Sequence, residues 1–186
     1  MASKPTVGLF VVTLRIGDCL TITPAIHAAA SHYDRVIVLC KPALRPIFAN
    51  HPETTSLIMQ SGWARLLELV FRLTGPLVTD AFCYTENRSF VLLARRVSSR
   101  AFAFEPSTTR FSDITYIPRP LDRRLHLIHE NLLLIKAAGV QPLSLKMRFM
   151  APERALKWGL SQIATLRERF EIIFIVKIQS VIQYKK

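Results

Sequence analysis

The stretch VGLFVVTLRIGDCLTITPAIHAAA, residues 7–30, decides the fold. It begins with a continuous apolar run rich in β-branched residues, Val7–Leu14, which predicts a strand covered on both faces. A turn carrying Asp18 follows, and Pro24–Tyr33 predicts a helix with Thr23 as its N-cap. A buried strand, a turn and a helix in this order predict the opening unit of a parallel α/β sheet.

Strand-like and helix-like segments continue to alternate after this unit. Further strands are predicted at Arg35–Cys40, Ser56–Met59, Leu77–Tyr84 and Arg100–Phe104. Further helices are predicted at Pro42–Asn50, Trp63–Leu73, Ser89–Val97 and Leu125–Ala138. This order predicts an α/β fold with a doubly wound, Rossmann-like parallel sheet, and such a sheet binds ligands at the carboxyl ends of its strands.

The segments near the end of the chain are less regular. Residues 105–124 contain three prolines and little periodicity, so a loop is predicted there. Gly139 stands where a C-cap glycine would end the preceding helix. Glu153–Phe170 carries an apolar stripe at helical spacing, and Ile172–Val176 is strand-like. The last strand would then be the first element of a second domain.

The charge balance favours an anionic partner. The chain has 25 basic and 13 acidic residues among 186, a net charge of +12. Such a surface attracts nucleic acid, anionic lipid headgroups or phosphorylated substrates. The basic residues are scattered, and the sequence has neither zinc-finger spacing nor an aromatic RNA-binding motif, so nucleic acid is the least favoured of these partners.

Cysteine usage and hydropathy indicate a cytosolic protein. Cys19, Cys40 and Cys83 are an odd number at wide gaps, which fits neither a disulfide framework nor a metal clip and suits a reducing compartment. Arg15 and Asp18 close off the N-terminal apolar run, so it makes a poor signal peptide. No apolar run approaches the ~20 residues that span a bilayer.

Asp18 has two readings on local grounds. An aspartate before a helix often caps it, because the carboxylate accepts backbone N–H bonds and suits the positive end of the helix. A carboxylate at the end of a strand can instead act as a general base toward a bound hydroxyl. Arg15 could keep this carboxylate ionised or hold a phosphorylated substrate. The sequence contains neither a GxGxxG nor a Walker motif, so a dinucleotide or P-loop site is not indicated.

The segment LRIGDCLTITPAI resembles the N-terminal signature of glycosyltransferase family 9, the heptosyltransferase-like enzymes of lipopolysaccharide core assembly. Its RIGD turn and the PAI that follows are similar to the family's first turn and helix. Four later segments of this chain resemble later segments of the family in the same order: RVIVLCKPALRPIFANHPE, SLIM, TDAFCYTENRSFVLLARRV and HLIHENLLLIKAAGV. The resemblance runs from Val7 to Phe170.

The resemblance implies a GT-B arrangement of two Rossmann-like domains, of which this chain would carry the N-terminal half. Residues 1–150 would form the acceptor-binding domain, 151–170 an interdomain helix, and 171–186 the truncated start of the donor-binding domain. It also implies inverting transfer of a sugar from a nucleotide-sugar, with no metal and no cofactor. The nucleotide-sugar would bind the missing C-terminal domain, so the chain alone would have little or no activity.

The resemblance also implies roles for individual residues. Asp18 would be the catalytic base, and Gly17 would let the backbone approach the substrate closely. Arg15, Arg88 and His126 would hold a phosphorylated saccharide or lipid-linked acceptor. The protein would then act in the cytoplasm, with a basic surface suited to peripheral contact with the anionic inner face of the membrane.

Each of these assignments has a simpler alternative. Arg88 could be a solvated surface charge, and His126 could serve only as a helix cap. His126 and His129 share a helix face and could recruit a metal, although the sequence shows no third ligand nearby. Cys19 fits a small packing residue better than a nucleophile, since no histidine adjoins it. The whole chain could be a truncated, non-catalytic module that binds an anionic saccharide or a membrane surface, or a nucleic-acid binder driven by charge.

Overall fold

The computed structural model describes residues 6–49, 51–54, 56–59, 78–85, 87–106, 110–120 and 126–168. The chain divides into two compact units, residues 1–150 and 151–186. The first unit holds a sheet with helices, and the described part of the second holds helix α7 (Glu153–Arg167). The helix predicted at Trp63–Leu73 and the strand predicted at Ile172–Val176 lie outside the described residues.

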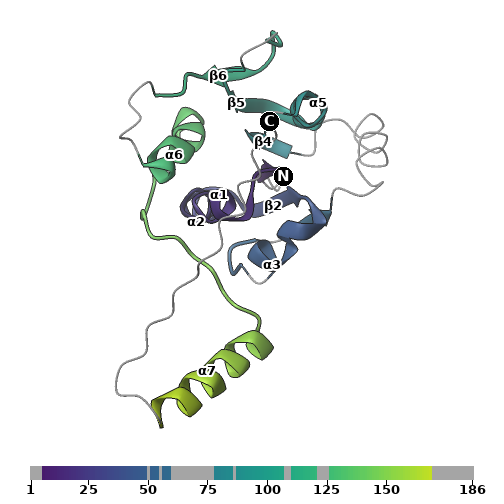
Figure 1. Ribbon diagram of the computed structural model, residues 1–186. Coiled ribbons are helices and arrows are strands. Elements are labelled where there is room, and N and C mark those ends of the chain that lie inside the picture. Colours follow the sequence, from purple (N-terminus) through teal and green to yellow (C-terminus); the bar gives the residue numbers. More distant parts are fainter. Residues whose placement is uncertain are drawn as a thin grey trace, which may run out of the picture. The chain divides into compact units, whose positions relative to one another are not determined.

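In the described part of the chain, six strands form one parallel sheet in the order β3-β2-β1-β4-β5-β6 (Figure 1). Their bounds are β1 Val7–Val12, β2 Arg35–Cys40, β3 Ser56–Met59, β4 Val78–Tyr84, β5 Ser98–Phe104 and β6 Thr115–Ile117. The order changes direction at β1, which lies between β2 and β4. The predicted doubly wound parallel sheet is therefore confirmed.

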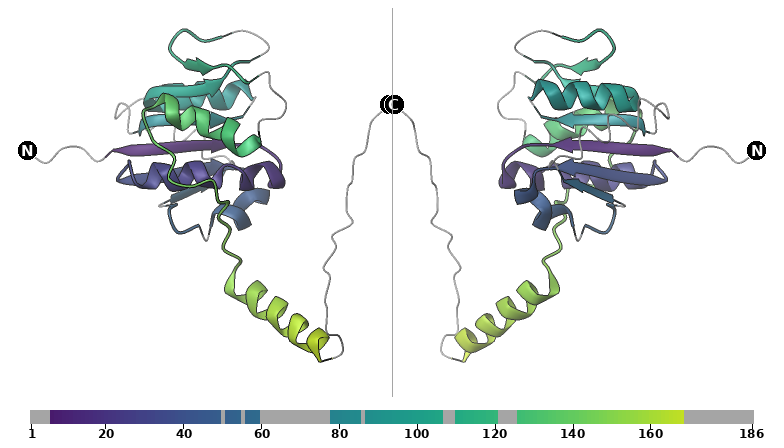
Figure 2. Two further views of the ribbon diagram at one scale, coloured as in Figure 1. Left: turned by 90° about the vertical axis from the view of Figure 1, so that its left-hand side faces the viewer. Right: turned by 90° about the vertical axis from the view of Figure 1, so that its right-hand side faces the viewer.

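Helices cover both faces of this sheet, as Figure 2 shows for α2 and α6 on one face and α5 on the other. The helix bounds are α1 Ile16–Leu20, α2 Thr23–Ala30, α3 Arg45–Phe48, α5 Arg88–Val97 and α6 Leu127–Ala137, with a 3₁₀ turn η1 at Pro42–Leu44. Successive side chains of β1 enter two different cores. Phe10 packs with α2 and α6, and Leu9 and Val11 pack with α5. This two-sided burial explains the continuous apolar run that opens the chain.

Three sequence predictions about local structure need correction. Residues 105–124 are not only loop, because β6 pairs there with β5 through Phe102 and Thr115. Its three residues are too few to show a period. The turn after β1 contains the short helix α1. Thr23 does not cap α2, since its hydroxyl donates to the Leu20 carbonyl (2.7 Å) and the N-cap is Ile22.

Two glycines have the places that their chemistry requires. Gly139 follows α6 with φ of 89°, and the next amide, Val140, donates to the Ile135 carbonyl at 3.0 Å, which confirms the predicted C-cap. Gly8 in β1 lies under the ring of Tyr33, and a Cβ at this glycine would stand 2.9 Å from Tyr33 Cδ2. The ring can pack there only because Gly8 has no side chain.

The Tyr33 ring reaches across the sheet to a buried ion pair. Its hydroxyl donates to Asp80 Oδ2 (2.6 Å), and Arg100 donates to both Asp80 oxygens at 2.6 and 2.7 Å. Asp80 in β4 is 1% exposed and stands opposite Arg100 of β5 in the strand register. Burial raises the pKa of the Tyr33 hydroxyl above its usual range, and its bond to Asp80 raises it further.

No helix among the described residues is long and apolar enough to cross a bilayer. No group of three or more His, Cys, Asp or Glu side chains among them could hold a metal ion.

Candidate functional site

At the carboxyl edge of the sheet, the three central strands β1, β2 and β4 end at residues that pair with one another. Val12, the last residue of β1, pairs with Cys40 at the end of β2 and with Tyr84 at the end of β4. The segments that leave these three strands therefore start side by side. Thr13 ties β1 to the β4 exit, because its amide donates to the Tyr84 carbonyl and its hydroxyl lies 2.5 Å from that of Thr85.

Asp18 lies in the first turn of α1, three residues after the N-cap Arg15. Its side chain is half-buried, and among the described residues it takes part in no hydrogen bond or ion pair. The N-cap residue Arg15 makes no side-chain capping bond either. The hydrogen-bonded cap expected of Asp18 is therefore not formed among the described residues. Asp18 does lie in the first turn of α1, where a carboxylate suits the positive end of the helix, as the capping alternative also expected.

Buried anchors fix the backbone around Asp18. Cys19, the next residue, is fully buried, and burial followed by the Asp18 charge raises the pKa of its thiol to about 12. A thiol that stays protonated is a packing group, as expected. Beyond α1, the Thr21 hydroxyl accepts from Asn131 Nδ2 of α6 (2.8 Å), and the Asn131 carbonyl accepts from Tyr84 (2.7 Å). The turn is thus joined to α6 and β4.

The remaining predicted site residues lie at exposed positions. Arg15 precedes α1, and Gly17 lies within it. Gly17 has no positive φ, and a Cβ there would meet nothing within 4 Å. The fold therefore does not need a glycine at Gly17, contrary to the predicted tight turn. Arg88 begins α5 just after β4, with its guanidinium 4.9 Å from the centre of the Phe111 ring.

His126 is the N-cap of α6, as its simpler reading proposed. Its Nδ1 accepts from the amide of Ile128 at 3.2 Å. Because Nδ1 accepts in this bond, the neutral ring carries its proton on Nε2, which can still donate to a ligand. The pairing of His126 with His129 as metal ligands finds no support, since the described residues contain no set of metal-ligating side chains.

Several solved structures resemble this chain, among them three of glycosyltransferases. A glycosyl transferase family 9 protein from Veillonella parvula matches 89% of this chain and 51% of its own, with a TM-score of 0.69 and 12% identity. The heptosyltransferase WaaC of E. coli with ADP-2-deoxy-2-fluoro heptose matches 74% of this chain (TM-score 0.53), and the same enzyme with ADP matches 78% (0.55), both at 14% identity. Neither protein-family models nor curated proteins give a match.

The chain spans about half the length of these solved structures, 50–51% of each. The chain has the fold of one half of a GT-B glycosyltransferase. The predicted resemblance to glycosyltransferase family 9 is thus confirmed as a structural match over most of this chain, and the heptosyltransferase WaaC matches it as well. In this GT-B half, the carboxyl edge with Asp18 is the place where a doubly wound sheet binds ligands.

Sequence reasoning missed Lys41, the first residue after β2. Val12 and Cys40 end level, so Lys41 leaves the sheet beside the β1 exit. Its ammonium is close enough to lower the pKa of Cys19, against the larger effect of burial. Among the described residues no acidic side chain pairs with Arg15, Lys41 or Arg88. A basic residue directly after a predicted parallel strand was the signal that could have identified Lys41.

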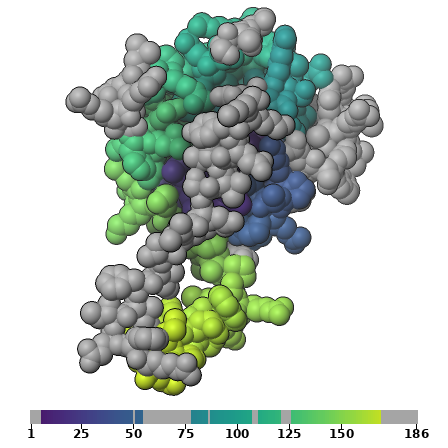
Figure 3. Space-filling model, viewed as in Figure 1, coloured from purple at the N-terminus to yellow at the C-terminus, as the bar shows by residue number. Residues whose placement is uncertain are grey.

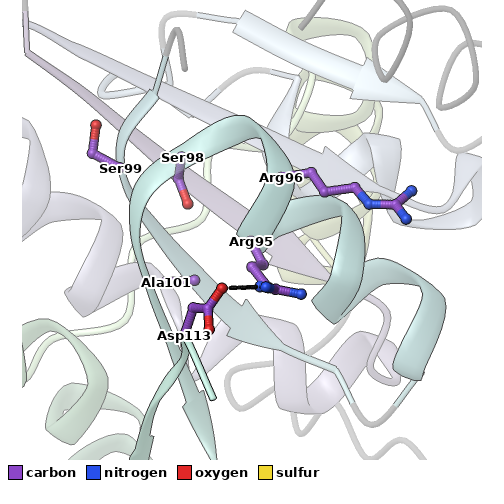
Figure 4. A pocket seen from close by; sticks show the side chains of 6 residues that line it. All are labelled: Arg95, Arg96, Ser98, Ser99, Ala101 and Asp113. Atoms are coloured by element: carbon purple, nitrogen blue, oxygen red, sulfur yellow. Dashed lines mark hydrogen bonds and ion pairs between the residues drawn. The ribbon is translucent and has the colours of Figure 1, made fainter. Parts of the chain in front are cut away.

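A hollow of ≈ 410 Å³ lies at the other edge of the sheet. It is lined by Arg95, Arg96, Ser98, Ser99, Ala101 and Asp113. Figure 4 shows Arg95 directed at Asp113, with which it forms an ion pair, so that cation is neutralised within the hollow. Ser98 begins β5, so the hollow lies at the amino edge, away from Asp18. The carboxyl edge remains the better candidate site.

Proposed function

We propose that this chain is the acceptor-binding half of an inverting, heptosyltransferase-like glycosyltransferase. The complete enzyme would transfer a sugar from a nucleotide-sugar to an acceptor of the lipopolysaccharide-core type. The observation that carries the proposal is the Asp18 carboxylate at the carboxyl edge of a GT-B half, which has no hydrogen-bond or ion-pair partner among the described residues. Such a carboxylate is available to take a proton from a bound hydroxyl.

Asp18 acts as the general base in the proposed reaction. It removes the proton of one acceptor hydroxyl while that oxygen forms a bond to the anomeric carbon of the donor sugar. The bond from this carbon to the nucleoside diphosphate breaks, and the diphosphate leaves with the electron pair. Attack opposite the leaving group inverts the anomeric centre. Asp18 is fixed for this role because the neighbouring Cys19 is buried and Thr21 is bonded to α6.

Four side chains hold the acceptor in this proposal. Arg15, Lys41 and Arg88 present cations at the edge where β1, β2 and β4 end, and phosphate oxygens on the acceptor would pair with them. His126 contributes its Nε2–H, since its Nδ1 is engaged as a cap. The net charge of +12 raises the local concentration of anionic acceptors and suits contact with an anionic membrane surface.

The nucleotide-sugar binds outside this chain in the proposal. The chain spans about half of the solved glycosyltransferases, so residues that grip the donor would come from the other half. We therefore expect acceptor binding without donor binding. The lipid-linked acceptor would be reached from the cytoplasmic side of the membrane.

The test is calorimetric titration of the purified chain with two ligands, a phosphorylated inner-core saccharide and ADP-heptose. We expect saturable binding of the saccharide, weakened by salt because phosphate contacts contribute to it, and no binding of ADP-heptose. Binding of ADP-heptose alone would contradict the assignment to the acceptor half. Absence of saccharide binding at low salt would contradict the proposal itself.

A second candidate function is a non-catalytic module that binds an anionic saccharide. The cations Arg15, Lys41 and Arg88, which pair with no acidic side chain among the described residues, favour it, because binding needs no donor half. The two functions differ when the chain is joined to a donor-binding half. Transfer by the joined protein would support the glycosyltransferase, and binding without transfer would support the module.

Replacing Gly17 with Ala separates a ligand contact from a folding role. The new methyl group meets open space, and alanine suits a helix better than glycine, so the free energy of unfolding should stay the same or rise by up to about 1 kcal/mol. Saccharide affinity should fall about tenfold or more if the ligand packs against this backbone. Urea unfolding and calorimetry measure the two effects. Unchanged affinity would remove Gly17 from the acceptor site.

A further inference from the structure

The extended segment 141–150 leads from α6 toward α7, belongs to the first unit and is bonded to the rest of that unit through Arg148. Figure 3 colours this part of the chain green in a space-filling view. The Arg148 amide donates to the Thr23 hydroxyl at 2.8 Å. Its guanidinium donates to Glu53 Oε1 at 2.5 Å and to His27 Nε2 at 3.0 Å. We call Arg148, Glu53, His27 and the adjoining His51 the Arg148 clasp.

The clasp fixes the protonation state of His27. A guanidinium only donates hydrogen bonds, so His27 Nε2 must accept from Arg148 and must be unprotonated. The ring proton is then on Nδ1, which lies 2.9 Å from Glu53 Oε1 and donates to it. His27 is therefore neutral when the clasp is closed. A second proton would put an N–H against the guanidinium and two positive charges side by side.

His51 lies beside the second carboxylate oxygen of Glu53, and its ring is also held in the uncharged form. Its side chain is fully buried, and its Nδ1 lies 3.0 Å from Glu53 Oε2 without the alignment of a hydrogen bond. Burial lowers the pKa of His51, and Arg148 and His27 lower it further, while Glu53 opposes them. Burial thus favours the uncharged form of His51, and the charge of the closed clasp is balanced between Glu53 and Arg148.

We propose that the Arg148 clasp is an acid-opened latch. Protonation of His27 breaks the contact of this ring with Arg148 and releases segment 141–150 from the rest of the first unit. Among the described residues, the titratable and charged groups that face His27 come from two segments: Glu53 and His51 from residues 51–54, and Arg148 from the connecting segment. Protonated His27 keeps its bond to Glu53 and competes with Arg148 for it. Histidine side chains in general change charge between pH 5 and 8, and this general range sets the two pH values of the test.

Release of the segment would change the tether between the first unit and everything after it. Ten extended residues reach up to about 33 Å, so an open latch lets the following part of the chain sample a larger volume. The segment also carries four exposed apolar side chains at alternate positions, Leu143, Leu145, Met147 and Phe149, each 48–58% exposed. The clasp therefore controls where these side chains are presented. This inference does not rest on the proposed glycosyltransferase activity.

Hydrogen–deuterium exchange of the whole chain tests the latch. The readout is protection of the amides around Arg148 at pH 7.5 and pH 5.5, corrected for intrinsic exchange, with β1 and β4 as internal standards of folding. In the wild-type chain protection should fall about tenfold or more at the lower pH, because hydrogen bonds to charged groups are lost. The strands should remain protected at both pH values.

Two variants and a control separate the latch from general acid instability. His27→Gln keeps one donor and one acceptor but cannot titrate, so the acid-induced loss should disappear. Glu53→Gln should lose protection already at pH 7.5. Glu105→Gln removes an acid that pairs with Arg110 elsewhere and should behave as the wild type. Equal wild-type protection at both pH values would overturn the proposal, as would acid-induced loss in the His27→Gln chain.

Discussion

Replacing Asp18 with Asn should lower the turnover of a complete enzyme built on this domain by about 10²–10⁴-fold. The amide has nearly the same shape as the carboxylate but cannot take a proton from the acceptor hydroxyl. The Asp18 carboxylate makes no hydrogen bond or ion pair with the described residues, and the bonds from Thr21 go to the Asp18 backbone carbonyl, which the change keeps. Steady-state transfer from ADP-heptose to a phosphorylated core saccharide measures the effect.

A matched control is Asp113→Asn, which alters an exposed carboxylate at the amino edge, paired with Arg95. It should leave turnover within about twofold, since surface changes away from a site have small effects. Acceptor affinity of the Asp18→Asn chain, measured by calorimetry, should stay within a few-fold of the wild type. Near-normal turnover of the Asp18→Asn enzyme would remove Asp18 from the chemistry and leave only acceptor binding to this edge.

The central strands were predictable because burial on both faces leaves a strong local signal. Val7–Val12 and Arg35–Cys40 read as continuous apolar runs, and each run is a strand in the structure. Helix α1 was not predictable in the same way, because of its five residues only Cys19 is buried. Its Gly17 and Asp18 are typical turn residues, so the local pattern favoured a turn.

The site was predictable only as far as local sequence decides chemistry. The RIGD turn placed Asp18 just after a strand. Whether its carboxylate caps a helix or stays available as a general base depends on a hydrogen bond to the backbone, which no sequence pattern displays. His126 carried the same ambiguity, and the structure shows its cap bond to Ile128. The Arg148 clasp joins residues 95 and 121 positions apart, so no periodicity or spacing indicates it. Contacts between distant segments are fixed by packing of the whole sheet.

Replacing Arg100 with Met should lower the free energy of unfolding by about 3 kcal/mol. Methionine keeps the apolar stem beside Phe102 but removes both hydrogen bonds to Asp80. The Asp80 carboxylate is 1% exposed, so it would be left buried with the Tyr33 hydroxyl as its one remaining partner in the described part of the chain. This loss of stability is near the lower end of the range for broken buried ion pairs, because the Arg100 side chain is 55% exposed and solvent screens its charge. Urea unfolding near pH 7 measures it.

Two control variants separate burial of the carboxylate from loss of an ion pair as such. Arg95→Met breaks the pair with Asp113, whose side chain is 57% exposed, and should cost no more than about 0.5 kcal/mol. Tyr33→Phe removes one hydrogen bond to Asp80 and should cost about 1 kcal/mol. If Arg100→Met proved no more costly than Arg95→Met, Asp80 would have access to water or another partner, and the buried pair would not stabilise the amino edge of the sheet.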